Sequence, residues 1–146
     1  DASRRRPPRG RPVSKPRIVY IVTSDTSADI LLRGRLSYLA QSGFDVCVIC
    51  GAGERVAAVS AREGVPCYTV DLRREISAAS DALALVELVR LLRRLAPDIV
   101  NASTPKAALL GLCAARLAQV PHRIYLARGL RLETLRPFAQ IGMRQI

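Results

Sequence analysis

Long apolar runs, aromatic residues and histidine are all scarce in this chain of 146 residues. No window holds the roughly 18 uninterrupted apolar residues that a membrane-spanning helix needs, so the sequence predicts no span. Aromatic residues make up 4% of the chain and tryptophan is missing, which disfavours base stacking, and we expect no specific nucleic-acid partner. The single histidine, His122, follows Pro121 at the start of a predicted strand, on the rim away from the expected site. A role for it as general base is therefore disfavoured.

The first 17 residues lack the apolar stretch of a secretory signal, although they hold seven of the 23 lysine and arginine residues. Proline, arginine, glycine and serine without apolar periodicity cannot offset the entropy of ordering, so we expect residues 1–16 to be a disordered basic tail. Three interpretations of this tail stay open. Residues 4–17 contact an anionic membrane surface, or they attract nucleic acid without specificity, or they are a solvated extension without function.

The four cysteines do not form a metal or redox motif, although Cys47 and Cys50 have the Cys-x-x-Cys spacing. Both stand on a predicted strand, where residues three apart point to opposite faces. The sequence therefore predicts buried reduced thiols, no disulfide and no metal ligands. Reduced thiols suit a cytoplasmic protein.

Apolar runs typical of strands alternate with segments of helical periodicity. Strands are predicted over residues 17–24, 44–50, 65–71, 97–103 and 122–128, and helices over 28–42, 54–63, 80–95 and 105–118. This alternation predicts an α/β fold, a doubly wound parallel sheet of Rossmann-like type. The chain is long enough for one core, so we expect one domain over residues 17–134 and the start of a truncated helix or linker over 135–146. Because the chain begins without methionine and ends without a helix terminator, we interpret it as a fragment or a trimmed chain.

Apolar spacing also predicts which helix faces turn inward. In the first helix, Leu32, Leu36 and Leu39 form one stripe that ends before Gly43. In the helix over residues 80–95, Ser80 is the expected N-cap. The inward residues expected there are Leu83, Val86 and Leu88.

The stretch from Asp45 to Asp71 matches part of a dinucleotide-binding fingerprint. Gly51 and Gly53 follow a strand, and an acid stands about 20 residues on, as that site requires. However, the fingerprint normally follows the first strand of the fold, and here a strand and a helix come earlier. Val56 also fills the position of the third glycine, where a branched side chain blocks close helix–strand packing. A small nucleotide- or dinucleotide-binding module that uses the Gly51 turn therefore stays as the alternative function, beside an ordinary turn.

Three further segments carry a family resemblance. They are a leucine-patterned helix ending in glycine before a strand (RGRLSYLAQSGFDVCVIC), a Thr-Pro-Lys turn with an alanine- and leucine-rich helix (LLRRLAPDIVNASTPKAALLGLCAARLAQVPHRIY), and the loop LARGLRLET. Together, over about residues 15–134, they resemble the amino-terminal half of GT-B glycosyltransferases of the family 4 type. That family includes bacterial capsule and lipid-linked oligosaccharide enzymes.

The resemblance implies a retaining transfer of sugar from a nucleotide sugar to an envelope glycan or a polyprenyl-diphosphate-linked acceptor. It implies no cofactor beyond that donor substrate. The family's paired-glutamate motif and most of its nucleotide-sugar site belong to a carboxyl-terminal half that has no counterpart here. The chain is therefore expected to be the acceptor-binding half, inactive without a donor-binding domain supplied in cis or in trans. The expected location is the cytoplasm, free or peripheral at the inner face of the membrane.

The chain departs from the family at two places. Arg128 precedes Gly129 where many members have histidine, and Asn101 and Ser103 stand in a turn where members often have histidine. Roles of those histidines therefore do not transfer. A third function class also stays open, in which a non-catalytic fragment binds a partner protein through its interdomain face.

Binding a diphosphate or a sugar requires cations and hydrogen-bond donors more than a nucleophile. Lys106 stands in the first turn of a helix, where a cation is unfavourable for the helix but an anion is welcome. We therefore predict that Lys106, with Ser103 and Thr104, contacts a phosphate or a sugar hydroxyl of the acceptor. A solvated lysine and a threonine cap are the structural alternative.

Two more loops contribute expected substrate-binding residues. Arg128 and Arg131 flank Gly129 after the last strand, where arginine forks suit phosphate and glycine allows close approach. Asp25 lies in the first loop and is expected to bind acceptor hydroxyls. A solvated basic loop and a local capping role for Asp25 are the respective alternatives.

Overall fold

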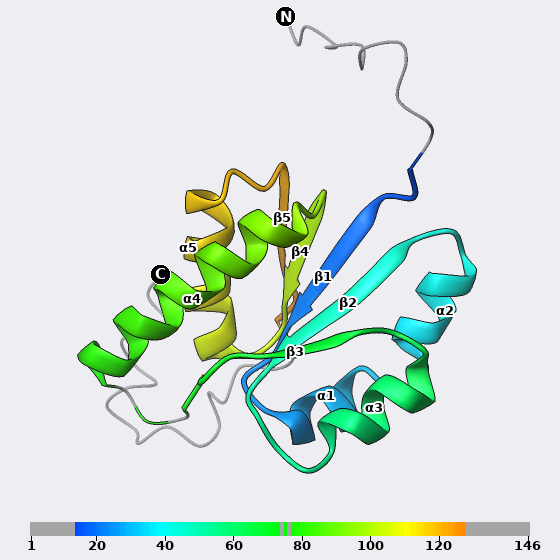
Figure 1. The fold of residues 1–146 in the computed structure, drawn as a ribbon, viewed down its shortest axis with the longest axis horizontal. Helices are drawn as coiled ribbons and strands as arrows, with labels where there is room; N and C mark the ends of the chain where they lie inside the picture. Colours follow the sequence, from blue (N-terminus) through cyan, green and yellow to red (C-terminus); the bar gives the residue numbers. More distant parts are fainter. Residues whose placement is uncertain (1–13, 74, 76, 128–146) are drawn as a thin grey trace, which may run out of the picture.

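The computed structural model describes residues 14–73, 75 and 77–127, which form a five-stranded parallel sheet between two layers of helices (Figure 1). The elements are β1 (Arg17–Ile21), α1 (Asp25–Leu31), α2 (Arg35–Gln41), β2 (Asp45–Cys50), α3 (Val56–Glu63), β3 (Cys67–Thr69), α4 (Ala78–Leu95), β4 (Ile99–Ala102), α5 (Pro105–Leu117) and β5 (His122–Tyr125). The strand order is β3-β2-β1-β4-β5. The predicted doubly wound parallel sheet is confirmed. Most of the predicted tail, and residues 128–146, lie outside the described residues.

Side chains of the central strands pack in two separate cores, one on each face of the sheet. On β1, Val19 and Ile21 pack with α4 and α5, whereas Ile18 and Tyr20 pack with the residues of α1, α2 and α3. The chain moves outward from β1 to β3 and then returns to the other side of β1 at β4. Because crossovers between parallel strands are nearly always right-handed, such a path places the two sets of helices on opposite faces of the sheet. The strand order therefore reverses between β1 and β4, the usual place of a ligand crevice.

The predicted helix over residues 28–42 is in fact two helices, α1 and α2. The break is at Gly34, whose φ of 72° is left-handed. Leu32 and Leu36 are fully buried as predicted. The apolar spacing runs across the break, which is why the sequence pattern gave no sign of it.

A buried carboxylate stabilises that break. Glu63 of α3 is 4% exposed, and its two carboxylate oxygens accept the backbone N–H groups of Gly34 (2.9 Å) and Ser37 (3.1 Å). Arg62 forms an ion pair with it at 3.0 Å. Burial by itself raises the pKa of Glu63, but the hydrogen bonds from these donors outweigh burial and hold the pKa below its ordinary value of 4.5. Glu63 thus caps α2, which has no side-chain cap of its own.

The prediction for α4 was wrong in two respects. The helix begins at Ala78 after the N-cap Ser77, so Ser80 lies inside the helix. Leu83 is 73% exposed and Val86 is 46% exposed, although both were expected to face inward, whereas Leu88 is buried as expected. The residues that do face the core are Ala84, Leu88, Leu91, Leu92 and Leu95. The surplus of apolar residues in this helix allowed two overlapping stripes, and packing against α5 selected one.

Cys47 and Cys50 are buried thiols on opposite faces of β2, as predicted, whereas Cys67 is half-buried and Cys113 is exposed. Cys47 belongs to the core beneath α4 and α5, and Cys50 belongs to the opposite core. Burial raises the pKa of Cys47 to about 11 and that of Cys50 to about 12, so both are protonated thiols at neutral pH. All four cysteines are free.

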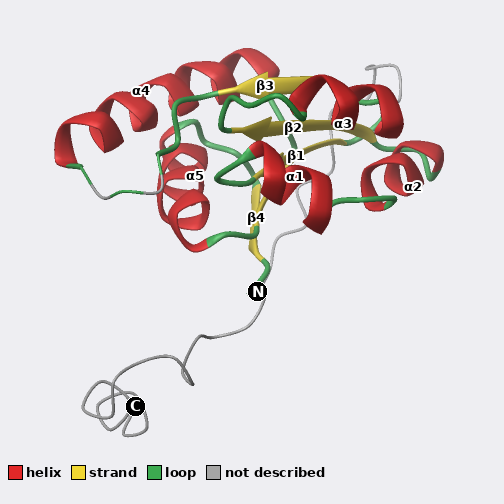
Figure 2. Cartoon of the chain, turned by 90° about the horizontal axis from the view of Figure 1, so that it is seen from below, coloured by secondary structure: helices red, strands yellow, loops and turns green. Residues whose placement is uncertain are grey.

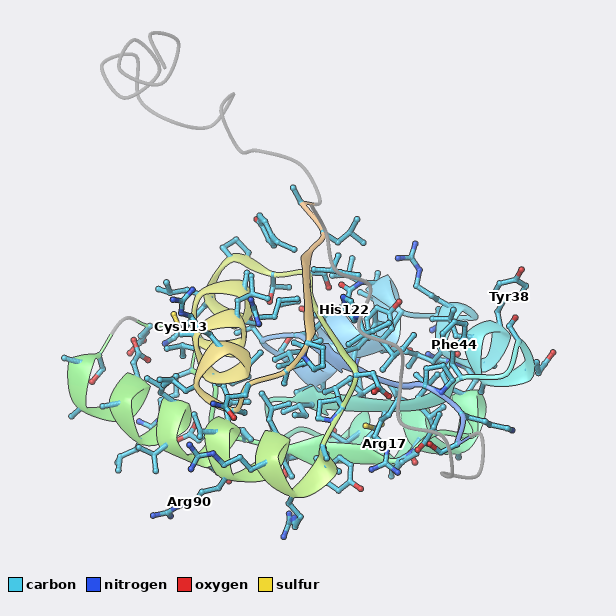
Figure 3. All side chains as sticks on the ribbon, turned by 90° about the horizontal axis from the view of Figure 1, so that it is seen from above. Arg17, Tyr38, Phe44, Arg90, Cys113 and His122 are labelled. Carbon is cyan, nitrogen blue, oxygen red and sulfur yellow. The ribbon has the colours of Figure 1, made fainter. Side chains whose placement is uncertain are left out.

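Strand β5 differs from the buried central strands, since all four of its residues are exposed at the edge of the sheet. It begins at His122, which pairs with Ile99 at the amino end of β4. Figure 3 shows His122 on this strand. The histidine therefore lies on the rim away from the carboxyl ends of the strands, as predicted.

The substitution Glu63→Gln should lower the free energy of unfolding by about 2 kcal/mol at pH 7, because a charge-assisted cap and an ion pair are lost. A carboxylate whose pKa is lowered by folding stabilises the protein above its unfolded pKa, and this contribution is lost as the pH falls through the folded pKa. The deficit of the variant should therefore shrink below about pH 4.5. Urea unfolding between pH 7 and pH 3 measures it, with the exposed Glu54→Gln as the matched control. A deficit independent of pH would contradict the charged cap.

Candidate functional site

The loops after β1, β2, β3 and β4 meet at the edge formed by the carboxyl ends of the strands. Figure 2, seen from below, shows these loops between the helices that surround them. The predicted residues Asp25, Ser103, Thr104 and Lys106 all lie in these loops or at the helix starts that follow them. The fold thus gathers the described part of the predicted site on one edge, beside the point where the strand order reverses.

Asp25, at the first position of α1, bridges to the loop after β2. Its carboxylate accepts the backbone N–H of Arg55 at 3.2 Å and that of Thr26 at 2.7 Å. The hydrogen bond from Arg55 is the main reason that the pKa of Asp25 lies below its ordinary value. Ser24 is the N-cap of α1, since its hydroxyl accepts the N–H of Ser27. Asp25 is therefore an ionised acceptor that already holds the start of α3.

The two glycines of the fingerprint-like turn are needed for contact with this first loop. A Cβ at Gly51 would meet the carbonyl oxygen of Thr23 at 2.6 Å, and one at Gly53 would overlap the carboxylate of Asp25. The N–H of Gly51 also donates to that Thr23 carbonyl at 3.2 Å. The chain's own atoms thus fill the space that glycine leaves open. In a dinucleotide site this space admits the pyrophosphate, so the geometry favours an ordinary turn.

Thr104 joins the loop after β4 to the loop after β1. It occupies the N-cap position of α5, but its hydroxyl does not cap that helix. Instead the Thr104 hydroxyl accepts the backbone N–H of Thr23 at 3.0 Å and shares a hydrogen bond of 2.6 Å with the Thr23 hydroxyl. The first-turn N–H groups of α5 are therefore without a side-chain cap, next to Pro105, which has no N–H to donate.

Two polar side chains of β4 and its loop lack hydrogen-bond partners among the described residues. Ser103 is 3% exposed, and its hydroxyl has no partner. The side-chain oxygen of Asn101 is buried in the same way. A buried hydroxyl without a partner costs about 1–3 kcal/mol. Buried polar atoms without a hydrogen-bond partner, next to the start of a helix, are typical of a site whose hydrogen bonds are completed by a ligand.

Lys106 is already paired within the chain. Its ammonium forms an ion pair with Asp81 of α4 at 2.7 Å, and it donates to the backbone carbonyl of Glu75. Only 14% of the Lys106 side chain and 22% of the Asp81 side chain are exposed. The prediction that Lys106 lies at this edge holds for its position, while its charge is neutralised by a neighbour that the sequence analysis did not single out.

The remaining predicted residues Arg128, Gly129 and Arg131 lie outside the described residues, so their contact with a substrate stays a prediction. Asp71, the acid of the fingerprint-like stretch, lies two residues beyond the end of β3 and is 64% exposed. It pairs with Arg73 at 3.1 Å. An exposed pair of this kind contributes little to stability.

Sequence reasoning missed a cluster of charges that joins α1 to α3. Asp29 forms ion pairs with Arg33 (3.0 Å), Arg55 (3.1 Å) and Arg62 (2.5 Å). The hydrogen bond from Arg62 is the largest of the effects that lower the pKa of Asp29 to about 2. Only Arg33 lies one helical turn from Asp29, so the sequence could have indicated one of the three pairs.

Other site chemistries find no support in the part of the chain that the structure describes. No three histidine, cysteine, aspartate or glutamate side chains gather there as metal ligands do. None of the helices described has the length and apolar composition to cross a membrane. The edge offers hydrogen-bonding groups and helix starts.

Comparison with known proteins identifies the family. The model of the glycosyl transferase 4-like family matches residues 17–146, and the chain belongs to this family. A curated relative is the capsular polysaccharide biosynthesis glycosyltransferase CapM of Staphylococcus aureus, 34% identical over 122 residues. The aligned part is 84% of this chain and 31% of CapM, so the chain spans about a third of the length of that relative.

Solved structures support the fold. A UDP-N-acetylglucosamine 2-epimerase superposes with a TM-score of 0.59 at 20% identity, over 81% of this chain and 33% of the epimerase. The glycosyltransferase VinC, solved in complex with DTDP, superposes with a TM-score of 0.54 at 19% identity, over 85% of this chain and 40% of VinC. At such identities the likeness concerns the fold alone. The predicted Rossmann-like domain of GT-B type is thereby confirmed.

The substitution Gly51→Ala should lower the free energy of unfolding by about 2 kcal/mol, because the new methyl group meets a backbone carbonyl that cannot turn away. Gly53→Ala should cost less, about 1 kcal/mol, since the Asp25 carboxylate can rotate away and loses only its bond to Arg55. That loss should also raise the pKa of Asp25 toward its ordinary value. Urea unfolding and an NMR titration of Asp25 measure the two effects, with the exposed Ala52→Ser as control. Equal costs for both glycine variants would contradict this account of the turn.

Proposed function

We propose that this chain is the acceptor-binding, amino-terminal half of a retaining GT-B glycosyltransferase. It takes an envelope glycan or a polyprenyl-diphosphate-linked acceptor, and the sugar comes from a nucleotide sugar. The observation that carries the proposal is the family match over residues 17–146, together with a capsular polysaccharide glycosyltransferase as relative. The chain covers 31% of that relative. We therefore infer that a donor-binding domain, in cis or in trans, is needed for activity.

The carboxyl edge supplies the chemistry that an acceptor diphosphate requires. The uncapped first turn of α5 presents N–H groups and the positive end of a helix dipole, which favour an anion. The Ser103 hydroxyl, one residue before the N-cap, has no partner among the described residues and can donate a hydrogen bond to a phosphate oxygen. The proposed substrate-binding set is Asp25, Ser103, Thr104, Arg128, Gly129 and Arg131. Lys106 lies at the same edge but is paired with Asp81. Arg128 and Arg131 add the fork geometry that suits phosphate oxygens.

Transfer by such a site depends on positioning and on charge stabilisation rather than on a nucleophile of this half. The acceptor half holds the acceptor hydroxyl and orients it toward the donor sugar. The donor-binding domain holds the departing nucleotide diphosphate. A lipid-linked acceptor places the enzyme at the cytoplasmic face of the membrane, where the basic residues 4–17 gain about 1 kcal/mol each from anionic lipid.

The proposal is tested by NMR titration of the isotope-labelled chain with geranyl diphosphate, a short soluble polyprenyl diphosphate. The expected result is saturable shifts at Asp25 and over residues 103–107, and no such shifts with NAD. Joined to a donor-binding domain, the chain should transfer sugar, whereas alone it should not. Shifts confined to residues 51–55 and produced by NAD would favour the nucleotide-binding module instead, and would contradict the proposal.

Ser103→Ala separates a binding role from a structural one. Removing a buried hydroxyl that has no partner should raise the free energy of unfolding by about 1 kcal/mol. The same change should weaken geranyl diphosphate binding about tenfold, because a hydrogen bond to a charged ligand is lost. Ser42→Ala, which removes a remote hydroxyl bonded to the Tyr38 carbonyl, is the control for binding. A Ser103→Ala variant with unchanged affinity would remove Ser103 from the proposed site.

A further inference from the structure

Lys106 stands at a position that helix physics disfavours for a cation. It is the second residue of α5, where the N–H groups and the helix dipole repel positive charge. Its ammonium is nevertheless well placed, 2.7 Å from the Asp81 carboxylate and in hydrogen-bond contact with the Glu75 carbonyl. Two of its three donors are thereby used inside the chain. The pair as a whole carries no net charge, so its attraction for a phosphate is reduced.

Both partners of Lys106 belong to the β3–α4 segment, which leads from β3 into α4 and of which residues 71–73, 75 and 77–84 are described. Glu75 precedes α4, and Asp81 lies in the first turns of that helix. Among the described residues, the other polar contact between α4 and α5 is the hydrogen bond that Arg93 donates to the Leu117 carbonyl, near the carboxyl ends of both helices. Lys106 is thus a polar link between the β3–α4 segment and the start of α5.

The same helix start is bonded to the other loops of the edge. Thr104 bonds to Thr23, and the loop that follows Thr23 reaches the start of α3 through the bond from Arg55 to Asp25. Separate polar contacts thus link the starts of α3 and α1, the loops after β1 and β4, and the starts of α5 and α4. Among these contacts, those of Lys106 reach the β3–α4 segment.

We infer that Lys106 is a positioning residue, which holds the β3–α4 segment as one wall of the acceptor site through Asp81 and Glu75, and does not bind the acceptor with its own ammonium. This inference rests on the proposed function, because the wall is defined by the acceptor that it borders. It also changes the expected behaviour of Asp81. In a positioning role Asp81 supports acceptor binding, whereas in direct binding by Lys106 it competes with the acceptor for the ammonium.

The experiment compares four variants of the 146-residue chain. Lys106→Met and Asp81→Asn each break the pair, and the double exchange Lys106→Asp with Asp81→Lys restores it with reversed charges. Arg116→Met removes an exposed charge near the other end of α5 and is the matched control. Two quantities are measured: hydrogen exchange of the amides of residues 71–73 and 77–84 without ligand, and the dissociation constant for geranyl diphosphate. Urea unfolding checks that the global stability of each variant is similar.

The expected result is that Lys106→Met and Asp81→Asn each speed exchange in the β3–α4 segment about fivefold. Each should also weaken geranyl diphosphate binding by a similar factor, and the double exchange should recover most of both losses. Arg116→Met should change neither quantity.

The inference is overturned if Asp81→Asn leaves binding unchanged or strengthens it while Lys106→Met weakens it, since the ammonium itself then contacts the acceptor. It is also overturned if neither variant changes the exchange rates. Failure of the proposed function looks different, because the unaltered chain then shows no saturable binding of geranyl diphosphate. In that case the exchange rates alone decide whether Lys106 holds the segment.

Discussion

The hydrogen bond between the hydroxyl groups of Thr23 and Thr104 is the contact on which the candidate site depends. It joins the ends of β1 and β4, the two strands between which the sheet reverses its order. Because the Thr104 hydroxyl is committed to this contact, it does not cap α5. This hydrogen bond thus links the loops after β1 and β4, and it leaves the first turn of α5 without a side-chain cap. The link between the two loops and the proposed anion site thus depend on one side chain.

The strands and their order along the chain could be predicted from sequence, because a strand buried on both faces needs an unbroken apolar run. Helix boundaries were harder. Gly34 interrupts an apolar stripe that reads as continuous, and the break persists because Glu63, 29 positions later, accepts its N–H. Leu83 and Val86 fit one helical stripe as well as Leu88 fits another. Such choices are made by packing between distant segments, which a single sequence does not display.

The candidate site, too, could be predicted from sequence only in part. Asp25, Ser103, Thr104 and Lys106 could be placed at one edge from sequence, because parallel strands bring their carboxyl ends together. The partners of those residues did not follow from sequence. Asp81 looks like an ordinary acid near a helix start, and nothing in the sequence links it to Lys106. Gly51 and Gly53 resembled a cofactor turn, yet what presses against them is the loop that carries Thr23 and Asp25. Close backbone approach requires glycine whether the neighbour is a ligand or the protein itself.

The exposed strand β5 has a practical consequence for the chain in solution. Among the described residues it pairs on one side only, with β4, and Ile124 and Tyr125 are each nearly half exposed. The opposite edge of the sheet ends in β3, which is only three residues long and offers little to pair with. A parallel strand with one free edge can pair with another strand. Within the described residues, β5 is therefore the edge at which a further strand would extend this sheet.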